Sequence, residues 1–101
     1  MKRKKINFKQ DFYKELENAE AAEAHLNDAM KSGEASTILL AIKDLAKVSG
    51  VVEISKKTGI QREHLYTILS EHGNPTLDNF NAIMDALGYE LQVKKKVSGD
   101  D

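Results

Sequence analysis

The 101-residue chain contains no cysteine, no tryptophan and a single proline. The lack of cysteine excludes disulfide bonds and thiolate metal sites, and it is compatible with a reducing compartment without requiring one. The longest apolar run, residues 38–42, is too short for a membrane span, which needs about 20 apolar residues. The basic start, residues 1–5, is not followed by an apolar stretch, so it does not resemble a signal peptide. We therefore expect a cytoplasmic protein with no membrane contact.

Patterns typical of catalysis and metal binding are also missing. His25, His64 and His72 are too far apart along the chain to supply the closely spaced pair of a helical metal site. No serine lies in a nucleophile elbow, and the six glycines occur singly rather than in a phosphate-binding loop. We predict that the protein is not an enzyme and needs no metal and no cofactor.

Charge is nearly balanced overall but unevenly distributed. The net charge is −1, yet residues 1–14 hold six basic residues against Asp11, and residues 15–35 hold six acidic residues against Lys31. Such blocks are either solvated faces or two separate surfaces, an acidic one for a basic protein and a more cationic one for DNA. The basic start is likewise either an arm that follows phosphates or a solubilising tail. Charge alone leaves these alternatives open.

Periodicity and capping residues predict an all-α domain of five helices. The helices cover residues 19–32, 35–48, 52–58, 62–70 and 77–87. Asn18 and Thr76 are the expected N-caps, and glycines close the helices. The last helix has an inner apolar stripe, namely Leu77, Phe80, Ile83, Met84 and Leu87.

The pattern changes after the last helix. Apolar and polar residues alternate over residues 89–94, which predicts a short C-terminal β-strand that pairs with residues 6–8 or with its own copy in a dimer. The predicted organisation is a basic N-terminal arm at 1–17, a helix-turn-helix domain at 18–93 and a flexible tail at 94–101.

Residues 51–69 have the pattern of a helix-turn-helix. Ser55 is the small residue where two short helices touch, and Gly59 lies where the chain must leave the first helix with positive φ. The apolar residues that hold the motif to the core are Ile54, Ile60, Leu65 and Ile68. The polar positions left facing outward, suited to base edges in a major groove, are Gln61, Arg62, Glu63, Tyr66, Thr67 and Ser70.

Some features of this stretch favour a plainer interpretation. A helical hairpin that only packs shows the same glycine and spaced aliphatic residues, and Tyr66 suits either the core or a contact surface. Gln61 is a weaker N-cap than serine or threonine. Phosphate repels Glu63 unless its carboxylate accepts a hydrogen bond from a cytosine amino group.

Two longer stretches of the sequence resemble a known protein family more specifically than the helix-turn-helix pattern does. The run "TGIQREHLY" at residues 58–66, followed by "LS" at 69–70, "GNPTL" at 73–77 and "ALG" at 86–88, resembles the addiction-module antidote family. This is the HigA-like branch of Cro/C1-type helix-turn-helix proteins. The resemblance covers about residues 11–93 and includes "AHLNDA" at 24–29 and "GE" at 33–34.

The resemblance implies a bacterial antitoxin. Family members neutralise a small basic toxin of the RelE/ParE fold and repress their own operon by binding double-stranded operator DNA as homodimers. By position, the six outward residues above would face DNA. The toxin surface would lie in the N-terminal region, at Asp11, Phe12, Tyr13, Leu16, Glu20 and Glu23.

Two other functions remain open. One is a free-standing helix-turn-helix repressor with no toxin partner. The other is an interaction module that no longer binds DNA, which the near-neutral charge favours because few counterions would be released.

Overall fold

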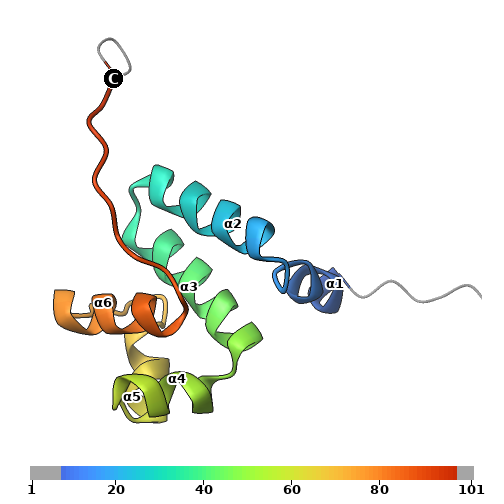
Figure 1. Cartoon of the computed structure of the whole chain (residues 1–101). Helices are drawn as coiled ribbons and strands as arrows, with labels where there is room; N and C mark the ends of the chain where they lie inside the picture. The colour runs from blue at the N-terminus through green and yellow to red at the C-terminus, as the bar shows by residue number, and fades with distance from the viewer. Residues whose placement is uncertain (1–7, 98–101) are drawn as a thin grey trace, which may run out of the picture.

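The described part of the chain, residues 8–97 of a computed structural model, contains six helices (Figure 1). They are α1 (Phe8–Glu15), α2 (Ala19–Ser32), α3 (Ala35–Ser49), α4 (Val51–Thr58), α5 (Arg62–Ile68) and α6 (Leu77–Ala86). The all-α class is confirmed, and α2 to α6 match the five predicted helices to within two residues. The predicted count of five is wrong because α1 is an additional helix. None of the helices among residues 8–97 is long and apolar enough to cross a membrane.

Helix α1 forms inside the segment that was interpreted as a basic arm. Its residues Phe12 and Tyr13, with Leu16 just beyond its end, are spaced along one side, and α1 packs against α3. Leu16 is only 6% exposed and Tyr13 is half-buried. This apolar stripe is short and lies among several lysines, so the sequence pattern did not predict a helix here. Residues 1–7 lie outside the described residues, so the arm itself stays a prediction.

The predicted C-terminal strand is absent. Among the described residues, 89–97 run without regular secondary structure, and their backbone makes one hydrogen bond, from the Tyr89 N–H to the Met84 carbonyl at 2.9 Å. Of the proposed partners, Phe8 belongs to α1, and residues 6 and 7 lie outside the described residues. Alternating side chains favour an extended backbone but do not supply the neighbouring strand that a sheet requires.

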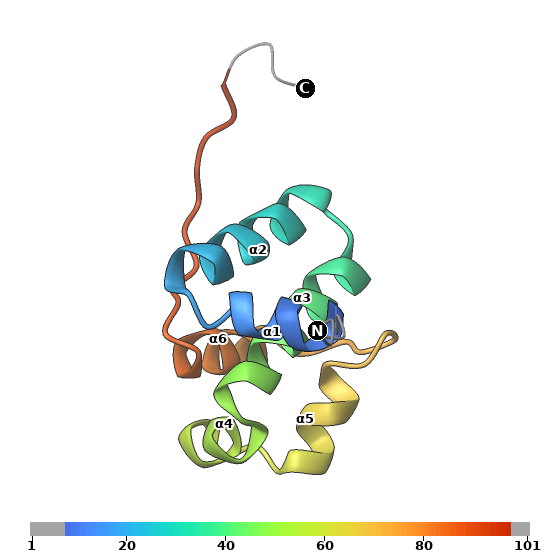
Figure 2. The ribbon, with the colours of Figure 1, turned by 90° about the vertical axis from the view of Figure 1, so that its right-hand side faces the viewer.

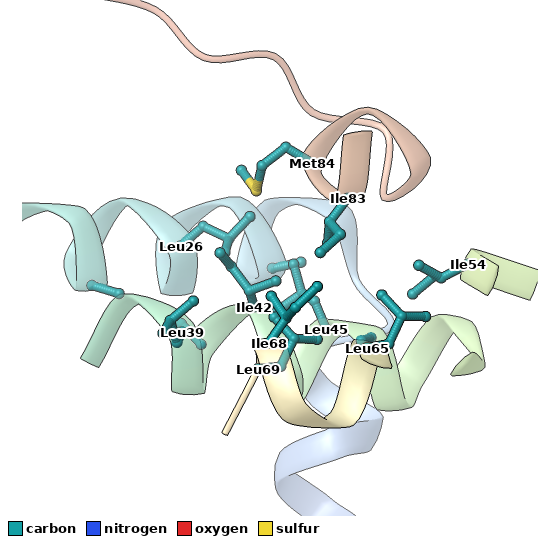
Figure 3. Close-up of a cluster of buried hydrophobic side chains, with 14 of the residues drawn as sticks. Leu26, Leu39, Ile42, Leu45, Ile54, Leu65, Ile68, Leu69, Ile83 and Met84 are labelled. Carbon is teal, nitrogen blue, oxygen red and sulfur yellow. The ribbon is translucent and has the colours of Figure 1, made fainter. Parts of the chain in front are cut away.

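The core gathers on α3 (Figure 3). Ile42 and Leu45 of α3 lie among buried side chains from the other helices, which are Leu26, Ile54, Leu65, Ile68, Leu69, Ile83 and Met84. Both predicted N-caps form, since the Asn18 side chain accepts a hydrogen bond from the Ala21 N–H and the Thr76 hydroxyl accepts one from the Asn79 N–H, each at 3.1 Å. Helices α4 and α5 lie together at one end of the molecule (Figure 2).

Candidate nucleic-acid interface

Side chains as well as backbone define the turn between α4 and α5. Gly59 has a φ of 77°, and its N–H donates to the Ser55 carbonyl at 2.8 Å. The Ser55 hydroxyl donates to the Ile60 carbonyl at 2.6 Å, and Thr58 Oγ1 accepts from the Ile60 N–H at 3.1 Å. Both backbone polar groups of Ile60 are therefore bonded to α4, which fixes the direction in which α5 leaves the turn.

Helix α5 is anchored on its inner side by two apolar residues. Leu65 is 1% exposed and Ile68 is 5% exposed, and both lie against α3 in Figure 3. Ile54 of α4 is buried beside them, whereas Ile60 in the turn is half-buried. The residues that the sequence assigned to the inner side of the motif therefore do lie inside or at the margin of the core.

The opposite side of α5 is open to solvent. Gln61, Arg62, Glu63, Tyr66 and Thr67 are all exposed, and 55% of Tyr66 is accessible, which places it on the surface rather than in the core. The arrangement presents an amide, a guanidinium, a carboxylate, a phenol and a hydroxyl within two turns of one helix. These are the side-chain types that read base edges by hydrogen bonding.

Hydroxyl groups at the far end of α5 are partly engaged. Ser70 is half-buried, and its hydroxyl donates to the Thr67 carbonyl at 2.7 Å. The Thr67 hydroxyl donates to the Glu63 carbonyl at 3.1 Å. Both oxygens retain lone pairs, so in this arrangement they suit contacts as acceptors more than as donors.

The structure also brings lysines to this interface that sequence reasoning missed. Lys43 and Lys47, one turn apart on α3, line a small pocket of about 20 Å³ with Leu65 and Tyr66 of α5. Lys47 is held in place by α1, because its Nζ donates to the Tyr13 hydroxyl at 3.4 Å and lies 5.7 Å from the centre of the Tyr13 ring. The sequence did contain a signal for this pair, namely two lysines four positions apart on the helix before the motif. Counting charged residues over long stretches of sequence does not reveal it.

Two more exposed lysines, Lys56 and Lys57, occupy the last turn of α4. With Lys43, Lys47 and Arg62 they make five basic residues on α3, α4 and α5, against the exposed carboxylates of Glu53 and Glu63 on α4 and α5. These elements therefore carry more basic than acidic residues, although the net charge of the whole chain is −1, and a polyanion responds to the charges that it approaches.

The six residues assigned to the toxin surface separate into two groups. Asp11, Phe12, Glu20 and Glu23 are exposed and Tyr13 is half-buried, so these five can meet a partner. Leu16 cannot do so directly, because it is packed in the core where α1 leads into α2. Its assignment as a contact residue rested on its spacing from Phe12, and that spacing reflects packing inside the chain.

A polar and aromatic junction holds α1, α2 and α3 together behind this surface. The rings of Phe12 and His25 pack edge to face, with their centroids 5.3 Å apart and an angle of 78° between the ring planes. His25 Nε2 lies 3.2 Å from Asp44 Oδ2, and Asp44 is the one charged side chain among the buried residues of the described part. No group of three or more potential metal ligands occurs among residues 8–97.

Comparison with known proteins gives a family match over most of the chain. The family model described as "probable addiction module antidote protein" matches residues 6–95. A protein of Haemophilus influenzae described as uncharacterized is 33% identical over 85 residues, which cover 84% of this chain and 88% of that protein. No solved structure matches the chain significantly. The matched region contains all six helices and the exposed side of α5.

Proposed function

Because the chain belongs to the family of probable addiction module antidote proteins, we propose that it is the antitoxin of a type II toxin–antitoxin module. In this role it neutralises a small basic toxin of the RelE/ParE fold and represses its own operon. The DNA-binding part of the proposal depends on one observation above all, the exposed polar side of α5 above the buried Leu65 and Ile68.

In the proposed DNA complex, α5 enters the major groove. Arg62 suits guanine and Gln61 suits adenine, since their side chains offer the paired hydrogen bonds that these bases accept and donate, and Glu63 accepts from a cytosine amino group. Tyr66, Thr67 and Ser70 extend the contact along the helix. Lys43 and Lys47 bind backbone phosphates beside it, which adds affinity that does not depend on sequence.

One short helix reads too few base pairs for an operator. Two copies of the chain on half-sites about 34 Å apart would supply both register and affinity. The proposed repressor is therefore a homodimer on double-stranded DNA.

The proposed toxin surface consists of Asp11, Phe12, Tyr13, Glu20 and Glu23, with Leu16 supporting it from beneath. Its exposed carboxylates complement a basic toxin and would accelerate the encounter. The surface belongs to α1 and the start of α2, whereas base reading belongs to α5. Neutralisation and repression should therefore be separable by mutation.

The experiment is co-expression of the tagged chain with the small basic protein encoded beside it, followed by copurification. In parallel, binding to the chain's own promoter is measured at two salt concentrations. Capture of the basic protein together with salt-sensitive promoter binding supports the proposal. Promoter binding without capture indicates a free-standing repressor. Capture without promoter binding contradicts the DNA-binding part.

A further inference from the structure

A pocket opens between α2 and α3, beside the proposed toxin surface. The two helices pack against each other (Figure 1), and the pocket is lined by His25 and Asp28 of α2 and by Leu40 and Asp44 of α3. Its volume is about 220 Å³. Small-molecule sites have volumes of roughly 300–1,000 Å³, so this pocket suits a single side chain of a partner better than a cofactor or a metabolite.

The wall of the pocket is mostly apolar. Its apolar part comes from Ala29 of α2 and from Leu40 and Ala41 of α3, and Leu40 is 57% exposed in the single chain. An aliphatic stem lying on these side chains would remove apolar surface of both partners from water. The pocket therefore favours a long side chain with several methylene groups.

Two carboxylates border this apolar wall. Asp28 is exposed, whereas Asp44 is only 8% exposed. His25 Nε2 lies 3.2 Å from Asp44 Oδ2, and the other oxygen, Oδ1, has no hydrogen-bond partner among residues 8–97. No unpartnered polar side-chain atom of the described residues is fully buried, so Oδ1 opens into the pocket that Asp44 lines. Apart from His25, no basic residue of the described part lines the pocket to compensate the two acids.

We propose that this pocket binds an arginine side chain of the basic toxin. The methylene stem of arginine matches the apolar wall, and its planar guanidinium is less strongly hydrated than the ammonium of lysine, which lowers the cost of placing it beside the buried Asp44. One guanidinium N–H donates to Asp44 Oδ1, and Asp28 supplies a second negative charge. The inference rests on the proposed function in one respect, because it takes the toxin as the source of the arginine.

The position of the pocket and its charge favour the toxin over the other proposed partners. His25 lines the pocket and packs edge to face against Phe12, so the pocket continues the proposed toxin surface from α1 onto α2 and α3. DNA would bring phosphates, which the two carboxylates repel. A second copy of the chain would have to supply Arg62, the one arginine among residues 8–97, which belongs to the proposed DNA interface.

Titration of the isotope-labelled, full-length chain with propylguanidinium tests the pocket without toxin or DNA. The NMR signals of the Ala29, Leu40 and Ala41 amides should shift and saturate, with a dissociation constant on the order of 10 mM for a ligand of so few atoms. Propylurea has a similar shape without the charge and should give no saturable shift. Propylammonium should bind more weakly than propylguanidinium, because it lacks the planar set of donors.

Two pairs of variants separate the charge of the pocket from its shape. Asp44→Asn should weaken propylguanidinium binding on the order of 10-fold, because it removes the charge of the acceptor. Asp85→Asn is its matched control, since Asp85 is an exposed residue of α6 that does not line the pocket. Thr37→Phe should fill the pocket, because Thr37 is exposed in the first turn of α3 and lines it, whereas its exposed neighbour Ser36 does not, so Ser36→Phe is the control.

The same four variants are then measured for binding to the basic protein that copurifies with the chain. Asp44→Asn and Thr37→Phe should each raise the dissociation constant of the complex on the order of 10-fold, mainly through faster dissociation, because a desolvated charge pair is lost or its site is filled. Asp85→Asn and Ser36→Phe should leave that constant unchanged. Circular dichroism of every variant verifies the fold.

Absence of a saturable shift with propylguanidinium, or saturation that Asp44→Asn leaves unchanged, would overturn the proposal. Toxin binding that stays at wild-type strength in Asp44→Asn and Thr37→Phe would also overturn it, with the proposed function intact. A chain that captures no toxin contradicts the proposed function instead, and the titration, which contains no toxin, then decides on the pocket by itself. Shifts of the same amides when the chain alone is concentrated would assign the pocket to a second copy and overturn the toxin as its occupant.

Discussion

The Ser55 hydroxyl donates a 2.6 Å hydrogen bond to the carbonyl of Ile60, across the turn between α4 and α5. Ser55 lies in α4, and Ile60 precedes Gln61, the N-cap of α5. The Gln61 side chain makes no capping hydrogen bond, so the start of α5 depends on the turn before it. The geometry of α5, the helix that we propose reads bases, is therefore set by residues that need not touch DNA.

Replacing Ser55 with alanine should lower the free energy of unfolding by about 1 kcal/mol, since the half-buried Ile60 carbonyl loses its partner. Urea denaturation measures this effect. Ser36→Ala is the matched control, because Ser36 is exposed in the first turn of α3 and should change stability by less than about 0.5 kcal/mol. Equal effects of the two substitutions would contradict the role given to the Ser55 bond.

Gly59 and Gly73 should respond differently to alanine. A Cβ at Gly59 meets nothing within 4 Å, so Gly59→Ala has only the left-handed backbone to oppose it, at about 1–2 kcal/mol. A Cβ at Gly73 would overlap the backbone carbonyl of Ile68, at the end of α5. Gly73→Ala should therefore cost more than about 2 kcal/mol, because backbone must move. A smaller loss at Gly73 than at Gly59, in the same urea series, would refute this ordering.

Sequence reasoning succeeded where a local signal was complete. The N-caps Asn18 and Thr76, the turn glycine Gly59 and the buried Leu65 and Ile68 each follow from propensity and periodicity, which act within a few residues. It also placed the polar side of α5 outward, because the inner positions of a short helix fix the outer ones.

It failed where the outcome depended on tertiary contact. Leu77, the first residue of α6, was expected in the inner stripe of that helix but is 70% exposed. Leu16 was expected on a partner surface but packs in the core. Lys43 and Lys47 line the same pocket as Tyr66 only in the folded chain, which no local pattern predicts.

Arg62→Ala should weaken operator binding by about 1–3 kcal/mol and relax the preference at one base pair. Arg62 is exposed, so the unfolding free energy should hardly change. Titration of the wild type and the variant against the operator and against operators substituted at single positions measures both effects. Unchanged operator affinity would remove Arg62 from the interface, and a loss of toxin binding in the same variant would point to misfolding.

Lys43→Ala and Lys47→Ala should act differently from Arg62→Ala. Each should reduce the slope of log K against log salt by about 0.9, because one phosphate contact and its released counterion are lost, while the ranking of operator sequences stays the same. Lys31→Ala is the control, since Lys31 is an exposed lysine in the last turn of α2 and does not border α5. A slope that falls equally in the control would assign the effect to net charge rather than to these positions.

Reversing charge at Glu20 and Glu23 should slow association with the toxin. Both carboxylates are exposed at the start of α2, so their contribution to a basic partner is long-range attraction, which governs the association rate more than the dissociation rate. Glu20→Lys combined with Glu23→Lys should lower the association rate constant by on the order of 10-fold at low salt, with a smaller difference at 0.5 M salt where screening is strong.

The control for this pair is Asp85→Lys, an equally exposed acidic residue on α6, which is distant from α1 in sequence and belongs to neither proposed surface. Stopped-flow or surface plasmon resonance measurements separate the two rate constants. A change confined to the dissociation rate would indicate short-range contacts in place of steering. An equal slowing by Asp85→Lys would mean that overall charge, and not the α1–α2 surface, directs the encounter, and the toxin site would then have to be sought on another face of the helical domain.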